Sequence, residues 1–489
     1  MGWRILYIKT KRRKNENKDP DIHCAGRFHR CMCGFRKGEV AYEDSPDGEM
    51  TINKKEKHGM KTARRNYLMV LLVVLAFTGC ASQPKNQIML MPAPDVFDQG
   101  DWDPFTDRDP VKDIPYGGIL YATDREPARK EGQYYLDERG HVLRLGVAQI
   151  TVGKEGMTWE EARRISLLKK RPEDYPLQVT GVQEVEILDR SINVLTESLV
   201  DKDQRKLPGE QFIAKVNAKL AISRVKDVFI YLHGYKVVFE NPLLVASELW
   251  HFLGYEGVFI AFAWPSTPNT LAYFSDLETA ALSAGNLRIL IQYLAEKTDA
   301  RRIHIIGYSA GTRVVAQALD QLALMHAGPD CKESAKALRI GHVILTGSDI
   351  DAHIFGSYLV DGMLDVVEDL TIYASAKDKA LGMSRWVFGR DRLGQIVSKN
   401  LSEDAVNYLS QNRKLIIVNA TDTSGADSGN GHAYFRKSPS TSSDILTTLM
   451  FDLKPEERGL EQTGGRPIWT FSTDYIDRLR AALVKARAN

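Results

Sequence analysis

Apolar and polar positions follow two alternating patterns along residues 228–419. Short, continuous apolar runs rich in β-branched residues are typical of strands buried on both faces. Between them lie longer segments with apolar residues every three or four positions, as on one face of a helix. This alternation predicts an α/β fold with a mostly parallel central sheet and helices on both faces. The predicted strands are 228–232, 257–263, 302–306, 340–345, 370–374 and 414–419, and the predicted helices are 242–253, 276–298, 312–327 and 352–367.

The segments on either side of this region have weaker patterns. Residues 82–115 are rich in Pro, Asp, Gln and Gly and have no periodicity, which predicts a flexible tether over residues 80–116. A folded domain is expected over residues 117–437. A C-terminal helical extension over residues 438–489 is expected to pack on that domain. Other predicted strands are 118–123, 141–152 and 183–188, and other predicted helices are 211–225 and 473–487.

An export signal is predicted inside the chain rather than at its start. A basic segment beginning at Met60 precedes an apolar run, and small residues then lead to Cys80, which is the order of a signal peptide over residues 60–79. The cysteine after Gly79 resembles a bacterial lipobox, in which Cys80 would carry the lipid. Ala81 after it is typical of sorting to the outer membrane. We therefore expect a bacterial cell-envelope protein anchored through Cys80, facing the periplasm.

A signal peptide belongs at a terminus, so residues 1–59 are predicted to be a mis-assigned or disordered extension. The formal net charge is +2, but basic residues gather in the first 65 positions and the remainder is mildly acidic. This charge argues against a nucleic-acid partner. The five cysteines have no regular spacing, and the chain has no phosphate loop or dinucleotide fingerprint. We expect no metal and no cofactor.

The segment Gly307-Tyr308-Ser309-Ala310-Gly311 lies between a predicted strand and a predicted helix. A strand–GxSxG–helix unit forms a sharp turn that lifts the serine hydroxyl above the sheet. Gly307 and Gly311 are expected because side chains there would collide with the neighbouring strand and helix. For the motif alone, a glycine-rich turn that starts a helix is the alternative. Serine is a poor nucleophile, so Ser309 also needs a base, an acid and oxyanion donors.

These partners occur in the chain order Ser, Asp, His that this type of turn requires. His432 follows the last predicted strand and is the expected base. Asp378, beyond strand 370–374, is the favoured acid, which would orient the histidine. Asp349, beyond strand 340–345, is the alternative acid, although an aspartate there can instead cap the next helix.

Two backbone N–H groups are expected to form the oxyanion hole. Ala310 follows the nucleophile, and Tyr235 lies in the loop after strand 228–232. His233 in that loop is expected to have a structural role.

Six segments together resemble a bacterial α/β-hydrolase family of unknown function, which is esterase- or lipase-like. The segments are Leu232-His233-Gly234-Tyr235, Ala263-Trp264-Pro265-Ser266, Gly307-Tyr308-Ser309-Ala310-Gly311, Ser348-Asp349-Ile350-Asp351, residues 373–381 and Gly431-His432-Ala433-Tyr434-Phe435. Residues 121–125 and 146–148 resemble its N-terminal antiparallel hairpin. The resemblance covers residues 117–437 and implies the α/β-hydrolase fold, but this family fixes no substrate.

The expected function is that of a lipid-anchored serine hydrolase. It would cleave small carboxylic esters, or related acyl compounds, through an acyl-enzyme formed on Ser309. The alternative is a non-catalytic envelope protein that uses the same fold as a binding scaffold. A missing triad member would favour that alternative, and the sequence contains a candidate for each.

Overall fold

The computed structural model describes residues 87–98, 102–200, 209–267, 273–328, 331–396, 401–462 and 466–488. All of them belong to one compact unit, Val74–Asn489. The predicted extension 1–59, the signal peptide 60–79 and Cys80 lie outside the described residues. Among the helices within these ranges, none is long and apolar enough to cross a membrane.

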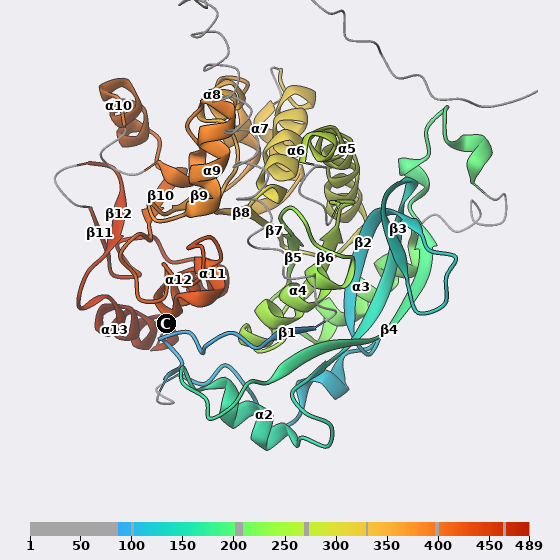
Figure 1. The fold of residues 1–489 in the computed structure, drawn as a ribbon, viewed down its shortest axis with the longest axis horizontal. Helices are drawn as coiled ribbons and strands as arrows, with labels where there is room; N and C mark the ends of the chain where they lie inside the picture. Colours follow the sequence, from blue (N-terminus) through green and yellow to red (C-terminus); the bar gives the residue numbers. More distant parts are fainter. Residues whose placement is uncertain are drawn as a thin grey trace, which may run out of the picture. The chain divides into compact units, whose positions relative to one another are not determined.

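Within the described residues, a twelve-stranded sheet has the order β1-β4-β3-β2-β6-β5-β7-β8-β9-β10-β12-β11 (Figure 1). The strands from β2 to β12 in this order pair in parallel, whereas β1, β4 and β3 are antiparallel beside β2. The α/β-hydrolase fold class and its antiparallel β2–β3 hairpin are therefore confirmed. The strands are β1 (Gln87–Met89), β2 (Ile119–Pro127), β3 (Tyr135–Val152), β4 (Pro176–Ile187), β5 (Asp227–Leu232), β6 (Val258–Ala263), β7 (Arg302–Tyr308), β8 (Ile340–Thr346), β9 (Asp369–Ala374), β10 (Leu415–Asn419), β11 (Leu460–Gln462) and β12 (Trp469–Phe471).

Helices bury both faces of the sheet. Along β5, Val228 and Ile230 belong to one hydrophobic core and Phe229 and Tyr231 to the other, because successive side chains of a strand point to opposite faces. Helices α3, α5 and α6 contribute to the first core, and α4, α12 and α13 contribute to the second. The helices are α2 (Trp159–Ser166), α3 (Glu210–Ile222), α4 (Glu240–Phe252), α5 (Tyr273–Lys297), α6 (Gly311–Met325), α7 (Cys331–Ala337), α8 (Ala352–Val360), α9 (Lys379–Phe388), α10 (Glu403–Gln411), α11 (Tyr434–Lys437), α12 (Pro439–Phe451) and α13 (Tyr475–Ala488).

The flexible tether predicted over residues 80–116 is wrong for its described part. Strand β1 pairs with β4, and the N–H of Met91 donates to the buried carboxylate of Glu248 at 2.6 Å. Val96 and Phe97 are buried in the second core. These residues lack periodicity because they are buried by pairing at a sheet edge and by contact with α4, not along one face of a regular element.

The C-terminal extension adds strands to the sheet as well as helices. Strand β12 pairs in parallel with β10, and β11 pairs antiparallel with β12. A buried ion pair of 2.7 Å joins Arg458 to Asp444 of α12. Asp444 also accepts hydrogen bonds from the hydroxyls of Tyr373 and Tyr475, at 2.6 and 3.1 Å. This network fastens the extension to β9. The three-residue strands were not predicted because they are too short for a recognisable alternation.

Candidate active site

Ser309 occupies a strained turn between β7 and α6. Its φ is 52°, a left-handed conformation that residues other than glycine rarely adopt. Its N–H donates to the carbonyl of Thr346 in β8 at 2.9 Å, which holds the turn against the neighbouring strand. A Cβ on Gly311 would lie 2.3 Å from the carbonyl oxygen of His233, so only glycine fits there. This is the strand–turn–helix geometry that the GxSxG motif requires.

Ser309, His432 and Asp378 form a continuous hydrogen-bond relay. The Ser309 Oγ lies 2.7 Å from His432 Nε2. His432 Nδ1 lies 2.7 Å from Asp378 Oδ2. Asp378 has no exposed carboxylate surface, whereas the His432 side chain keeps 12% of its surface exposed. Three side chains that follow three different strands therefore meet at one edge of the sheet.

Backbone and side-chain contacts hold the histidine loop beside Asp378. Asp378 caps α9, because its Oδ1 accepts the N–H of Leu381 at 3.0 Å. The N–H of Lys379 donates to the carbonyl of Asn430 in the histidine loop at 3.0 Å. Tyr434 is buried, accepts the N–H of Gly347 at 2.7 Å and donates its hydroxyl to the carbonyl of Tyr373 at 2.6 Å. These contacts leave the His432 ring facing both partners.

Asp349, the alternative acid, has other partners. It forms an ion pair with Arg313 at 3.3 Å and lies 3.6 Å from Arg392. Its second oxygen accepts the hydroxyl of Ser384 at 2.7 Å. The structure thus joins His432 to Asp378, and it places Asp349 between the partly exposed Arg313 of α6 and the buried Arg392. Helix α8 is capped by Asp351 instead.

The expected oxyanion donors flank Ser309. Ala310 lies at the N-terminus of α6, where backbone N–H groups have no partner within the helix. The loop after β5 contacts the nucleophile directly, since a Cβ on Gly234 would lie 2.7 Å from Ser309 Cβ. Tyr235 is the next residue of this loop. Both donors therefore belong to segments that touch the serine.

Arg125, a buried arginine in β2, holds the same loop from behind. It has no exposed surface, and its guanidinium forms a 2.6 Å ion pair with Asp137. The guanidinium also donates to the carbonyl of Val237 at 2.9 Å. Arg125 was predicted only as part of the N-terminal hairpin, with no role of its own. The signal was the buried-strand position of Asp124-Arg125, which directly follow the apolar start of β2, Ile119–Ala122.

His233 is fully buried and stacks on Trp264, with ring centroids 5.4 Å apart. Its two ring nitrogens lie 2.7 Å from the carbonyl of Gly234 and 3.0 Å from the carbonyl of Trp264. Burial, together with the positive charge of Arg125, lowers the pKa of His233 to about 3. A neutral ring has a single N–H, which donates to one of these carbonyls. The indole N–H of Trp264 donates to the carbonyl of His233 at 2.8 Å, and this buried contact between the two loops fits the structural role expected from the sequence.

The fold and this geometry define the class of the protein as an α/β-hydrolase. The segment 210–449 matches a family model described as "Alpha/beta hydrolase of unknown function (DUF900)". It contains the strands β5 to β10 and the relay. The uncharacterized protein alr1448 of Nostoc sp. is 38% identical over 131 residues, which are 22% of this chain and 34% of that protein. The match therefore spans about a third of the relative's length, and neither description states a substrate.

Proposed function

We propose that this protein is a serine hydrolase that cleaves carboxylic esters, or related acyl compounds, through an acyl-enzyme. The observation that supports this proposal is the relay from Ser309 through His432 to Asp378, with 2.7 Å at both steps. A serine hydroxyl bound to an imidazole that is itself oriented by a carboxylate is the arrangement that makes serine nucleophilic.

In the proposed acylation step, the Asp378 carboxylate accepts the Nδ1–H of His432, which leaves the Nε2 lone pair free to take the Ser309 proton. The serine oxygen then attacks the ester carbonyl carbon. The negative charge on the carbonyl oxygen is stabilised by the N–H groups of Ala310 and Tyr235. When the tetrahedral intermediate collapses, the ester bond breaks and the imidazolium gives its proton to the leaving alkoxide. The products are the free alcohol and acyl-Ser309.

In the proposed deacylation step, water replaces the alcohol. His432 Nε2 takes a proton from this water as its oxygen attacks the acyl carbonyl. The second tetrahedral intermediate expels the Ser309 oxygen, which recovers the proton from the imidazolium. The carboxylic acid leaves and the relay returns to its starting state. Each step uses the same two oxyanion donors.

Labelling with a fluorophosphonate probe tests this proposal directly. The wild type is expected to react covalently and to hydrolyse 4-nitrophenyl esters, whereas Ser309→Ala should do neither. Ser348→Ala is a matched control, since this buried serine at the end of β8 donates to Thr312 rather than contacting His432. A wild type that neither labels nor hydrolyses esters of any acyl length would refute the enzyme and favour the binding-scaffold alternative.

We also propose that the protein reaches the outer membrane of a bacterial cell on a lipid attached to Cys80. The support is the order of basic segment, apolar run and small residues before this cysteine. In a bacterial host, the wild type should partition with membranes and Cys80→Ala should not. Equal membrane partitioning of the two proteins would contradict the anchor without affecting the catalytic proposal.

A further inference from the structure

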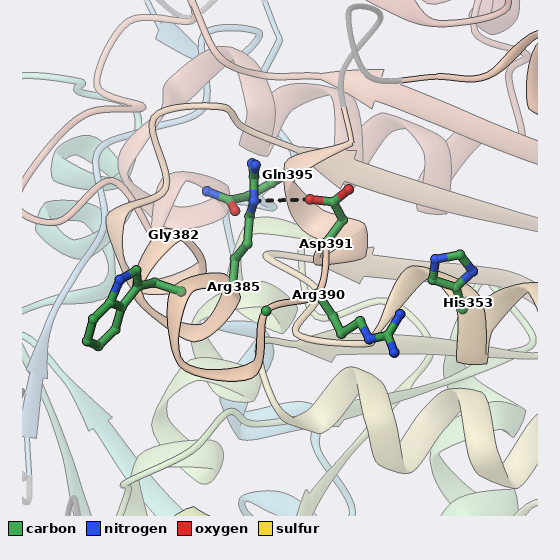
Figure 2. A pocket seen from close by; sticks show the side chains of 8 residues that line it. His353, Gly382, Arg385, Arg390, Asp391 and Gln395 are labelled. Atoms are coloured by element: carbon green, nitrogen blue, oxygen red, sulfur yellow. Dashed lines mark ion pairs between the residues drawn. The ribbon is translucent and has the colours of Figure 1, made fainter. Parts of the chain in front are cut away.

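A pocket of about 550 Å³ lies between α8, α9 and the segment that follows α9 (Figure 2). Four of the lining residues are spaced three, four and seven positions apart, which places them on one face of α9 and its C-cap. They are Gly382, Arg385, Trp386 and Gly389. Gly382 has no side chain to fill the pocket next to Gln395. A Cβ at this position would have one neighbour within 4 Å, the amide nitrogen of Gln395 at 3.5 Å. The remaining lining residues are His353, Arg390, Asp391 and Gln395.

The pocket is built on the same strand ends as the relay. Gln395 donates its side-chain amide to the backbone carbonyl of Asp378 at 2.9 Å, so one lining residue contacts the triad aspartate. The N–H of Gly394 donates to the carbonyl of Ser348 at 2.9 Å, which ties the pocket wall to the end of β8. Gly347, one residue earlier, packs against the ring of His432, because a Cβ there would lie 3.1 Å from its Cε1.

Positive charge predominates in this pocket. Arg385 forms a 3.0 Å ion pair with Asp391, so the carboxylate neutralises only one of the two arginines. Figure 2 shows Arg385 extending toward Asp391 and Gln395, whereas Arg390 extends toward His353. Within the described part of the chain, no ion pair joins Arg390 to a carboxylate. Arginine remains charged at any physiological pH and presents a planar set of donors that matches carboxylate and phosphate oxygens.

One other group suits a ligand that combines an apolar part with an anion. Trp386 is 57% exposed, although a tryptophan normally buries its large apolar surface. This exposed ring offers an apolar surface in the same pocket as Arg390.

We propose that this pocket binds an anionic group, a carboxylate or a phosphate, carried by the ester that Ser309 attacks. The proposal rests on the proposed hydrolase function for its link to turnover. The substrate would then be an acyl ester that carries an anionic group at a distance from the ester bond that is cleaved. Arg390 is the residue that binds the anionic group of the ester. Arg385 adds positive charge to the pocket, although it is paired with Asp391.

Matched substrates test the proposal. 4-Nitrophenyl hydrogen adipate and 4-nitrophenyl hexanoate have acyl chains of equal length, and only the first carries a terminal carboxylate. The wild type is expected to favour the adipate in kcat/KM. Arg390→Gln should lower the adipate-to-hexanoate ratio about 2- to 10-fold, mainly through KM, the size expected for a charge-assisted hydrogen bond from an exposed arginine. Arg390→Lys should retain part of the preference. Arg129→Gln removes an exposed arginine of the β2–β3 connection and should leave the ratio unchanged.

Direct binding separates this proposal from the catalytic one. Adipate and inorganic phosphate are titrated separately into Ser309→Ala, with and without Arg390→Gln, and heat is measured. Binding that depends on Arg390 supports the pocket even if no ester is hydrolysed, and the tighter ligand identifies carboxylate or phosphate as the group recognised. Ester hydrolysis with an unchanged charge preference in Arg390→Gln, and no Arg390-dependent binding, would overturn the pocket assignment and leave the hydrolase intact.

Discussion

Replacing Asp378 by asparagine separates the proposed catalytic role of this side chain from its structural role. Asp378 has one oxygen on the Leu381 N–H at 3.0 Å and the other on His432 Nδ1 at 2.7 Å. Asparagine caps helices about as well as aspartate, so α9 should be retained. An asparagine has only one oxygen, however. If it keeps the cap, its NH₂ group faces His432 Nδ1.

That arrangement reverses the histidine tautomer. Nδ1 must then accept a hydrogen bond, which forces the proton onto Nε2, and Nε2 can no longer take the Ser309 proton. The loss of kcat expected for a triad with the wrong tautomer is about 10⁴-fold. At about 1.4 kcal/mol per tenfold change, this is roughly 5.5 kcal/mol of transition-state stabilisation. A 180° rotation of the side-chain amide would restore the tautomer, because the amide oxygen would then accept the Nδ1–H of His432. The same rotation would break the helix cap, at a cost of about 1 kcal/mol, and would place the NH₂ group against the N–H of Leu381.

Steady-state hydrolysis of a 4-nitrophenyl ester, with urea unfolding in parallel, measures both consequences. Asp378→Asn should lose kcat with little change in unfolding free energy. Asp349→Asn is the matched control, because it removes a carboxylate from Arg313 and Arg392 without contact with the relay. This control should lose about 1–3 kcal/mol of unfolding free energy. That is less than the loss expected on breaking a fully buried ion pair, because Arg313 is partly exposed. Its kcat should stay within about threefold of the wild-type value. The opposite result, with kcat lost in Asp349→Asn and kept in Asp378→Asn, would refute the assignment of the acid.

Two further predictions concern residues outside the relay. Arg125→Gln removes the hydrogen bond to Val237 that holds the loop of Tyr235, the proposed oxyanion donor. The kcat should therefore fall about 10- to 100-fold with KM nearly unchanged, and added guanidinium should restore part of the lost kcat. An unchanged kcat would contradict this positioning role. Burial opposes protonation of His342, but its ion pairs with Asp369 and Asp452 outweigh burial and raise its pKa from the ordinary 6.5 to about 9. The contribution of protonated His342 to the free energy of unfolding should therefore be complete below pH 6.5 and lost as the pH rises through 9. In urea unfolding this loss should be roughly 1–3 kcal/mol, a modest value because Asp452 is partly screened by solvent. His342→Gln should remove this part of the pH dependence, and an identical pH profile in the variant would show that His342 is not its source.

Much of the central sheet could be predicted from local pattern. The strands at 228–232 and 302–306 are continuous apolar runs, because both faces of a parallel strand are covered by helices. The sharp turn at Ser309 was likewise predicted from its glycines and its neighbours. Predictions failed where burial did not follow a period, as in residues 87–98, which pair at a sheet edge and contact α4.

The sequence by itself determined the parallel α/β architecture, the strand–turn–helix around Ser309 and the chain order of Ser309, Asp378 and His432. These depend on spacing along one segment, which periodicity records. The tertiary structure alone decided which aspartate meets the histidine, since both candidates follow strands that end at the same edge. It also decided that Arg125 supports the loop of Tyr235 and that Arg385 and Arg390 line one pocket with Gln395. Such contacts join side chains from separate segments, and their geometry exists only once the sheet has brought those segments together.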